Sequence, residues 1–256
     1  MRTGWVPDQH GAWAMTLSPL IIGIFWTAPT GRHALLAAAW LCAFLTFNSF
    51  EMWAKTSKKR RARTLPALLC YAAATAVLGL ALVWLSPGLL WWTPIFAAPV
   101  LLTCLLVYRG RERDLATRGL SIATAVLILP VGAGLERASG APSAQPHEAW
   151  TATAVLFLYF FGTVLFVRSM IRKRADAGAH RACIAWHAVT GALVVGIGAI
   201  DGYPRPVLAA VAWALLIARA VILPRMQSAR GTLRPAILGL TEVAWCVILT
   251  AALMVH

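Results

Sequence analysis

The 256-residue chain contains few charged residues, and acidic ones are the scarcest. Only 12% of the residues are charged, nine are Asp or Glu, 60% are hydrophobic, and the mean hydropathy is +0.72. Soluble domains carry about 25% charged residues, so this composition argues against an ordinary soluble fold. It also excludes a disordered chain, because 12 Trp and long Leu, Ala and Val runs leave little polar chain to solvate. We therefore interpret residues 1–256 as a single integral membrane domain.

Cysteine clusters and nucleophile motifs are also missing. The five Cys are widely spaced, form no C-x-x-C and lie in apolar runs, as is typical of structural cysteines. No G-x-S-x-G, Walker A or G-x-G-x-x-G sequence occurs, so the chain has no motif for hydrolase, P-loop or dinucleotide chemistry. Residues 1–10 are polar and no small-residue cleavage site follows a short apolar core, so we expect no cleavable signal peptide.

Long apolar segments dominate what is present. A helix needs about 20 apolar residues to cross the hydrocarbon. Nine segments qualify, at 12–29, 33–53, 65–86, 89–108, 118–136, 149–171, 182–200, 205–223 and 235–255. Turn residues or charges separate them, as at Ser86-Pro87-Gly88. The predicted fold class is all-α, a polytopic membrane bundle of nine transmembrane helices.

The positions of Lys and Arg predict the orientation. With the N-terminus in the cytoplasm, 20 of the 23 basic residues fall in or beside cytoplasmic segments, and only Arg32, Arg137 and Arg205 fall outside. This is the positive-inside pattern, which predicts an external C-terminus and a location in the bacterial cytoplasmic membrane. It also explains the net charge of +14 without nucleic acid, so the lipid bilayer is the expected partner.

Ionisable side chains within the apolar segments gather toward the predicted cytoplasmic side. Asn48, Glu51 and Lys55 share one helical face because they are spaced i, i+3, i+7. Intramembrane ionisable residues are costly and often functional, so this face is a candidate site. Polarity at one side only favours a pocket open to the cytoplasm over a channel.

Some of these charges have an ordinary structural interpretation. Arg219 and Glu242 are expected to form an ion pair between neighbouring helices, since unpaired charges are disfavoured in lipid. His187 is expected to be a hydrogen-bonded core histidine. The run Lys58–Arg63 is typical of a segment that sets topology and binds anionic headgroups. Gly132 and Gly134 form a G-x-G that we interpret as a helix-packing feature.

Two family resemblances follow from short motifs. Residues 6–15 (VPDQHGAWAM) resemble the opening of the YwiC-like bacterial membrane proteins, which implies a family but no activity. The layout also resembles the UbiA superfamily of intramembrane prenyltransferases, with nine helices and an active site facing the cytoplasm. Pro19–Gly23 resembles the P-x-L-x-G pattern of the UbiA first helix, Phe47–Glu51 the first acidic motif N-D-x-x-D, and Asp176–His180 the second, D-x-x-x-D.

The UbiA resemblance implies a site. Asn48, Glu51 and Asp176 would be catalytic and would hold Mg²⁺, which takes oxygen ligands and bridges to the diphosphate of a polyprenyl substrate. The substrate-binding residues would be His10, Lys55, Tyr108, Arg109, Arg111, Arg168, Arg172, His180 and His187. The sequence departs from the pattern, because Ser49 replaces an Asp and because Lys55 and His180 stand where acids are expected. Guanidinium groups can also bind diphosphate directly, so the basic cluster could replace the metal.

Three classes of function are compatible with these residues. The first is a UbiA-like prenyltransferase or a lipid-diphosphate-binding protein with a cytoplasm-facing polar pocket. The second is a permease in which Arg168, Arg219 and His187 bind a small anion and Glu242 carries a proton. The one-sided polarity and the lack of a clear inverted repeat weigh against it. The third is a non-catalytic membrane scaffold, which the shortage of acidic residues would fit.

Overall fold

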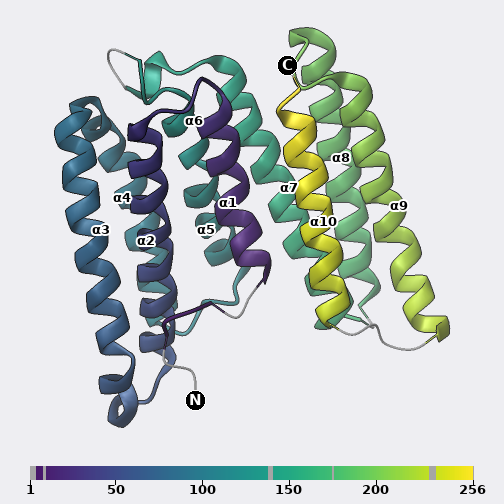
Figure 1. The fold of residues 1–256 in the computed structure, drawn as a ribbon. Helices are drawn as coiled ribbons and strands as arrows, with labels where there is room; N and C mark the ends of the chain where they lie inside the picture. The colour runs from purple at the N-terminus through teal and green to yellow at the C-terminus, as the bar shows by residue number, and fades with distance from the viewer. Residues whose placement is uncertain (1–3, 8–9, 138–140, 175, 231–234, 256) are drawn as a thin grey trace. The chain divides into compact units, whose positions relative to one another are not determined.

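The computed structural model describes residues 4–7, 10–137, 141–174, 176–230 and 235–255. Within these ranges every regular element is a helix (Figure 1). The α-helices are α1 (His10–Phe25), α2 (Gly31–Lys55), α3 (Leu65–Leu85), α4 (Thr93–Tyr108), α5 (Leu115–Val126), α6 (Ile128–Ala133), α7 (His147–Ile171), α8 (Ala177–Asp201), α9 (Pro206–Arg230) and α10 (Pro235–Leu253). The 3₁₀-helices are η1 (Lys58–Arg63), η2 (Pro87–Trp92) and η3 (Pro142–Ala144).

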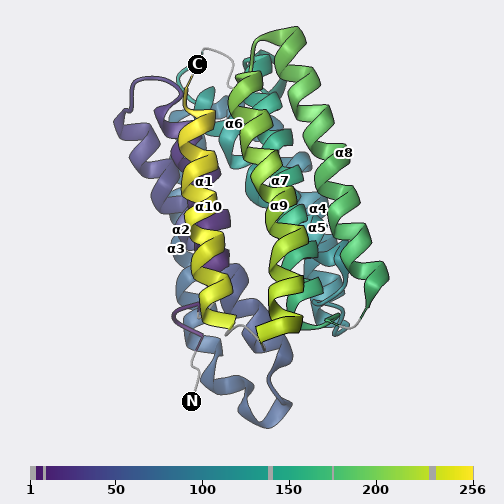
Figure 2. The same ribbon diagram turned by 90° about the vertical axis from the view of Figure 1, so that its right-hand side faces the viewer.

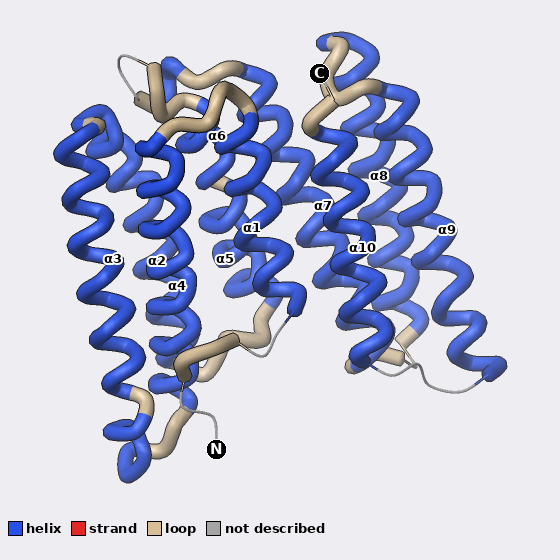
Figure 3. Tube along the Cα trace, in the orientation of Figure 1, coloured by secondary structure: helices blue, strands red, loops and turns tan. Residues whose placement is uncertain are grey.

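The all-α prediction is confirmed for the described residues, which contain no strand (Figure 3). Seven helical stretches among them are long and apolar enough to cross a membrane, and two further apolar helices, Gly11–Phe25 and Leu238–Leu253, are shorter. Each of the nine expected segments contains a helix. The expected break at residues 86–88 is confirmed, because α3 ends at Leu85 and η2 begins at Pro87. The count of nine spans and the orientation stay predictions.

The chain divides into two compact units, Met1–Ala149 and Trp150–His256. Unit 1 holds α1 to α6, and unit 2 holds nearly all of α7 together with α8, α9 and α10. The interpretation of residues 1–256 as one membrane domain stays a prediction.

Two glycines bring helices of unit 1 into direct backbone contact. A Cβ on Gly23 of α1 would lie 2.6 Å from the carbonyl oxygen of Leu129, and a Cβ on Gly132 of α6 would lie 2.9 Å from the carbonyl carbon of Gly23. Only glycine permits such an approach, which is how small residues pack membrane helices. The predicted packing role of Gly132 is therefore confirmed.

A buried histidine ties the start of α2 to α6. The Thr30 backbone N–H donates to Nδ1 of His33 over 3.1 Å, and Nε2 of His33 lies 3.1 Å from the carbonyl oxygen of Gly132. Since a carbonyl only accepts, Nε2 carries the proton and Nδ1 accepts. The imidazole thus satisfies a backbone group at each of its nitrogens.

Unit 2 is an up-and-down bundle of α7, α8, α9 and α10 (Figure 2). The Trp213 indole donates to the Thr190 hydroxyl over 2.9 Å, and Gly191 leaves room for the ring, because a Cβ there would lie 2.7 Å from it. The Tyr203 hydroxyl donates to the Leu253 carbonyl over 2.8 Å and fastens the α8–α9 connection to the end of α10.

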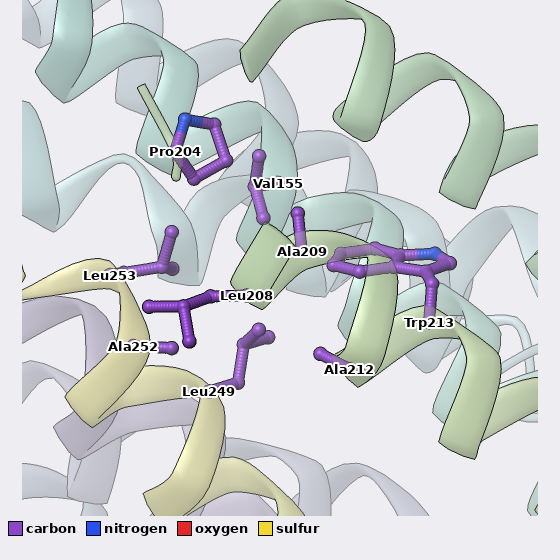
Figure 4. A pocket seen from close by; sticks show the side chains of 9 residues that line it. All are labelled: Val155, Pro204, Leu208, Ala209, Ala212, Trp213, Leu249, Ala252 and Leu253. Carbon is purple, nitrogen blue, oxygen red and sulfur yellow. The ribbon is translucent and has the colours of Figure 1, made fainter. Parts of the chain in front are cut away.

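A small apolar pocket lies inside unit 2 (Figure 4). Its lining side chains come from α7, α9, α10 and the segment before α9, and they are Val155, Pro204, Leu208, Ala209, Ala212, Trp213, Leu249, Ala252 and Leu253. The one polar group among them, the Trp213 indole N–H, is already bonded to Thr190. The pocket therefore offers no chemistry of its own.

Candidate functional site

One end of unit 1 gathers most of its positive charge. Here α2 ends, η1 follows, α3 begins, α4 ends and α5 begins (Figure 1). Residues 51–118 contain ten Lys or Arg against three Asp or Glu, and none of these thirteen lies between residues 64 and 108. We call this charged region, residues 51–63 and 108–118, the basic end.

Lys55 lies between two carboxylates of the basic end. Its Nζ is 2.6 Å from Oε1 of Glu51, one turn earlier on α2, and 3.9 Å from Oε1 of Glu112 in the α4–α5 connection. Both carboxylates are largely buried, with 16% and 12% of the side chain exposed. The Lys55 ammonium therefore occupies the position between Glu51 and Glu112 where a metal cation would otherwise be attracted. Glu112 was not among the residues predicted from the sequence.

The segment before α1 explains the serine in the first motif. The fully buried Ser49 hydroxyl donates to the Gly4 carbonyl over 2.9 Å, and Asn48 Nδ2 lies 3.5 Å from the same oxygen. An ionised Asp could not donate this hydrogen bond, whereas the Ser49 hydroxyl does. Ser49 is thus a structural residue that fastens the N-terminal segment to α2.

Arg61 of η1 caps the C-terminal end of α2. Its guanidinium carbon lies 4.4 Å from the Trp53 ring centre and 6.0 Å from that of Tyr108. It also donates from Nε to the Thr56 carbonyl (3.2 Å) and from Nη2 to the Ala54 carbonyl (3.3 Å). Carbonyls at a helix end have no partner in the helix, so Arg61 caps them. Tyr108, a predicted substrate contact, forms part of this aromatic frame.

Other basic side chains of this end are open to a ligand. Arg111 pairs with Asp114, at 2.6 Å between Nε and Oδ2, but both side chains are exposed. Arg109, Lys58 and Lys59 are exposed and form no ion pair with any described residue. Arg113 adds a second cation, with its Nε 3.6 Å from Oε1 of Glu112. The basic end therefore combines two largely buried carboxylates, balanced by Lys55 and Arg113, with a surplus of accessible cations.

Four predicted residues lie around the α7–α8 connection of unit 2. Arg168 is in the last turn of α7, and Arg172 follows the end of that helix. Asp176 is the N-cap of α8, and its Oδ1 accepts from the Ala179 N–H over 3.0 Å. His180 lies in the first turn of α8, with Nε2 3.0 Å from the Arg174 carbonyl. The side chain of His10 lies outside the described residues.

The Asp176 cap leads to a prediction that distinguishes a structural role of this carboxylate from a catalytic one. The Ala179 N–H and then Lys173 lower the pKa of Asp176, so its support of α8 is present above pH about 4 and is lost as the pH falls below that. Asn caps as well as Asp, whereas Ala does not. We expect Asp176→Asn to keep the melting temperature at pH 7 and Asp176→Ala to lower it by about 2–4 °C. Differential scanning fluorimetry measures both. Loss of function in Asp176→Asn at an unchanged melting temperature would instead support a catalytic carboxylate.

The predicted magnesium ligands are already engaged. Glu51 contacts Lys55, Asn48 lies beside the Gly4 carbonyl, and Asp176 caps α8 and contacts Lys173 at 3.2 Å. The described residues contain no group of three or more His, Cys, Asp or Glu side chains that could hold a metal. Magnesium binding stays a prediction, and these contacts do not favour it.

A second polar cluster lies inside unit 2. Arg219 of α9 and Glu242 of α10 form a buried ion pair between Nη1 and Oε1, as the sequence predicts. His187 is also buried, and its Nδ1 donates to the Cys183 carbonyl over 2.8 Å. The three residues lie near the middle of their helices rather than toward one end, because α8 begins at Ala177 and α9 extends to Arg230.

These features define the class of the molecule. It is a multi-pass α-helical membrane protein with a strongly basic end on unit 1 and a buried ion pair in unit 2. The model of the YwiC-like protein family matches residues 6–133, which is half of the chain, and the chain belongs to that family.

The similarity to known proteins extends beyond the half of the chain that the family model matches. Over 172 residues the chain is 26% identical to "Uncharacterized protein YwiC" of Bacillus subtilis (strain 168), covering 67% of this chain and 69% of the relative. No solved structure matches the chain. The YwiC-like resemblance of residues 6–15 is thereby confirmed, and the UbiA resemblance stays a prediction.

Proposed function

We propose that this protein binds the phosphate or diphosphate group of a polyprenyl lipid at the basic end of unit 1, without needing a metal. The observation that carries the proposal is the contact of Lys55 with both Glu51 and Glu112. Lys55 and Arg113, whose Nε lies 3.6 Å from Oε1 of Glu112, together balance the two carboxylates, so these do not repel an anion. The surrounding arginines remain positive, and guanidinium groups match phosphate oxygens in two-point hydrogen bonds.

The apolar surface of unit 1 suits the lipid tail. α3 starts at the basic end, and its exposed side chains include Leu69, Val77, Leu80 and Trp84. A headgroup held by Arg109 and its neighbours would leave an isoprenoid chain free to lie along such a face in the bilayer. The proposed site is the cytoplasmic side of a bacterial inner membrane protein, in agreement with the positive-inside pattern.

Thermal stability in detergent tests the proposal. Geranylgeranyl diphosphate is expected to raise the melting temperature by about 3 °C or more at saturation, as binding linkage requires, and geranylgeraniol is expected to leave it unchanged. The shift should persist in EDTA. A shift that appears only with Mg²⁺ would restore the predicted metal site, and no shift under either condition would overturn lipid-phosphate binding.

Charge-removing variants locate the binding surface. Arg109→Gln combined with Arg111→Gln is expected to weaken binding at least about tenfold, since each removes a charged hydrogen-bond donor. Arg32→Gln is the matched control, because Arg32 is an exposed arginine at the opposite end of unit 1, paired with Glu136 at 3.8 Å. Equal losses in the two proteins would mean that the lipid does not bind at the basic end.

A further inference from the structure

The buried ion pair of unit 2 uses only one of the three guanidinium nitrogens of Arg219. Arg219 has 5% and Glu242 7% of its side chain exposed. The guanidinium plane is covered by Phe166, whose ring centre lies 4.1 Å from Cζ. Nη1 holds Glu242, yet Nε and Nη2 are buried and have no hydrogen-bond partner among the described residues. Unpaired buried donors are costly, so such a pair of atoms in a native protein needs an explanation.

The two unused donors form a fork. Nε and Nη2 lie on one edge of the planar guanidinium and point their hydrogens the same way. This edge matches the two oxygens of a carboxylate or another oxyanion. With Phe166 on the face and Glu242 at the end of the guanidinium, the side edge is the part that remains for a ligand.

Unpaired acceptors accompany the fork. Oε2 of Glu242 is buried without a partner, and so is Nε2 of His187, whose Nδ1 carries the proton that it donates to the Cys183 carbonyl. Nε2 of His187 faces α7 at Gly162, where a Cβ would lie 3.0 Å away. Gly162 is one turn from Phe166 on the same side of α7, so the imidazole and the guanidinium face one side of that helix.

Charge balance determines what can bind. The Arg219–Glu242 pair is neutral, so an added anion would leave a net negative charge among apolar side chains, which is strongly unfavourable. A proton on Oε2 of Glu242 would restore neutrality. The other titratable groups around the pair are Tyr159 on α7, Cys183 and His187 on α8, and Cys246 on α10.

We propose that this centre, formed by Arg219, Glu242 and His187, binds one small monocarboxylate on the free edge of Arg219 together with one proton on Glu242. A monoanion suits a centre that has a single cation and a single carboxylate to protonate. The inference concerns unit 2 alone and does not depend on lipid-phosphate binding at the basic end.

Acetate serves as the probe, with chloride as the reference anion. We expect acetate to raise the melting temperature of the detergent-solubilised protein more than chloride does. In a weakly buffered solution, one proton per protein should be taken up. Apparent affinity should fall about tenfold per unit of rising pH, as the uptake of one proton requires. No acetate-specific shift in the wild type would mean that buried water alone satisfies these atoms, and the proposal would be wrong.

Two variants test the assigned atoms. Arg219→Lys keeps a charge for Glu242 but lacks the fork, so acetate affinity should drop at least about tenfold. Arg225→Lys, on the exposed side of α9, is the matched control and should bind as the wild type does. Glu242→Gln imitates the protonated carboxyl and should bind acetate without proton uptake, even if Arg219→Lys proves unstable. Unchanged affinity in Arg219→Lys, or proton uptake that persists in Glu242→Gln, would overturn the assignment.

Discussion

Replacing Glu242 with Leu is expected to lower the melting temperature of the protein by about 6–20 °C. The substitution leaves the Arg219 guanidinium buried against Phe166 with no counter-charge. Removing one partner of a buried ion pair costs about 3–5 kcal/mol, and 1 kcal/mol corresponds to about 2–4 °C in a protein of this size. Differential scanning fluorimetry in a mild detergent measures the shift.

The double variant Arg219→Met/Glu242→Leu separates the charge from the packing. Both charges are then gone, and apolar residues of similar volume often match or exceed the stability of a buried pair. We expect it to melt within about 3 °C of the wild type. Arg32→Gln provides the exposed comparison, because its pair with Glu136 is open to solvent and such pairs contribute about 0–1 kcal/mol. A double variant as unstable as Glu242→Leu would mean that altered packing at position 242, and not the unpaired charge, causes the loss.

Helix positions follow from the sequence because apolar length is a strong signal. The expected segments 65–86 and 149–171 differ from α3 and α7 by one or two residues. The helix α8 begins earlier than expected, where charged residues precede the apolar run, and α9 ends later than expected, where charged residues follow it. Hydropathy ends a segment at the first charges, but backbone hydrogen bonding continues the helix through Arg181 and Arg225. Hence Arg219 and His187 lie deeper in their helices than the sequence suggested.

At the basic end, the sequence predicts only the contact between neighbours on one helix. Spacing alone places Glu51 beside Lys55. Glu112 was missed because its approach to Lys55 depends on how α4 returns to the end of α2, which is a tertiary contact. The role of Ser49 was missed for a similar reason, since its partner is a carbonyl 45 residues earlier. Pairing of Arg219 with Glu242 could be anticipated because lipid leaves few other partners for a charge.

The second large effect on stability is expected for Gly23→Ala, because Gly23 permits the close contact between α1 and α6 in unit 1. Its Cβ would lie 2.6 Å from the Leu129 carbonyl oxygen and 3.1 Å from the Leu129 Cα, so α1 and α6 must separate. Backbone atoms cannot rotate aside as a side chain can, and overpacking of this kind costs about 1–3 kcal/mol or more. We expect the melting temperature to fall by about 2–12 °C.

Gly79→Ala is the matched control for this variant, because a Cβ at Gly79 in α3 meets nothing within 4 Å. Alanine also favours a helix over glycine by about 1 kcal/mol, so the control should melt at or slightly above the wild-type temperature. The difference between the two variants then measures the backbone contact between α1 and α6, free of helix propensity. Equal melting temperatures for Gly23→Ala and Gly79→Ala would mean that the close approach of α1 to α6 at Gly23 does not contribute to stability.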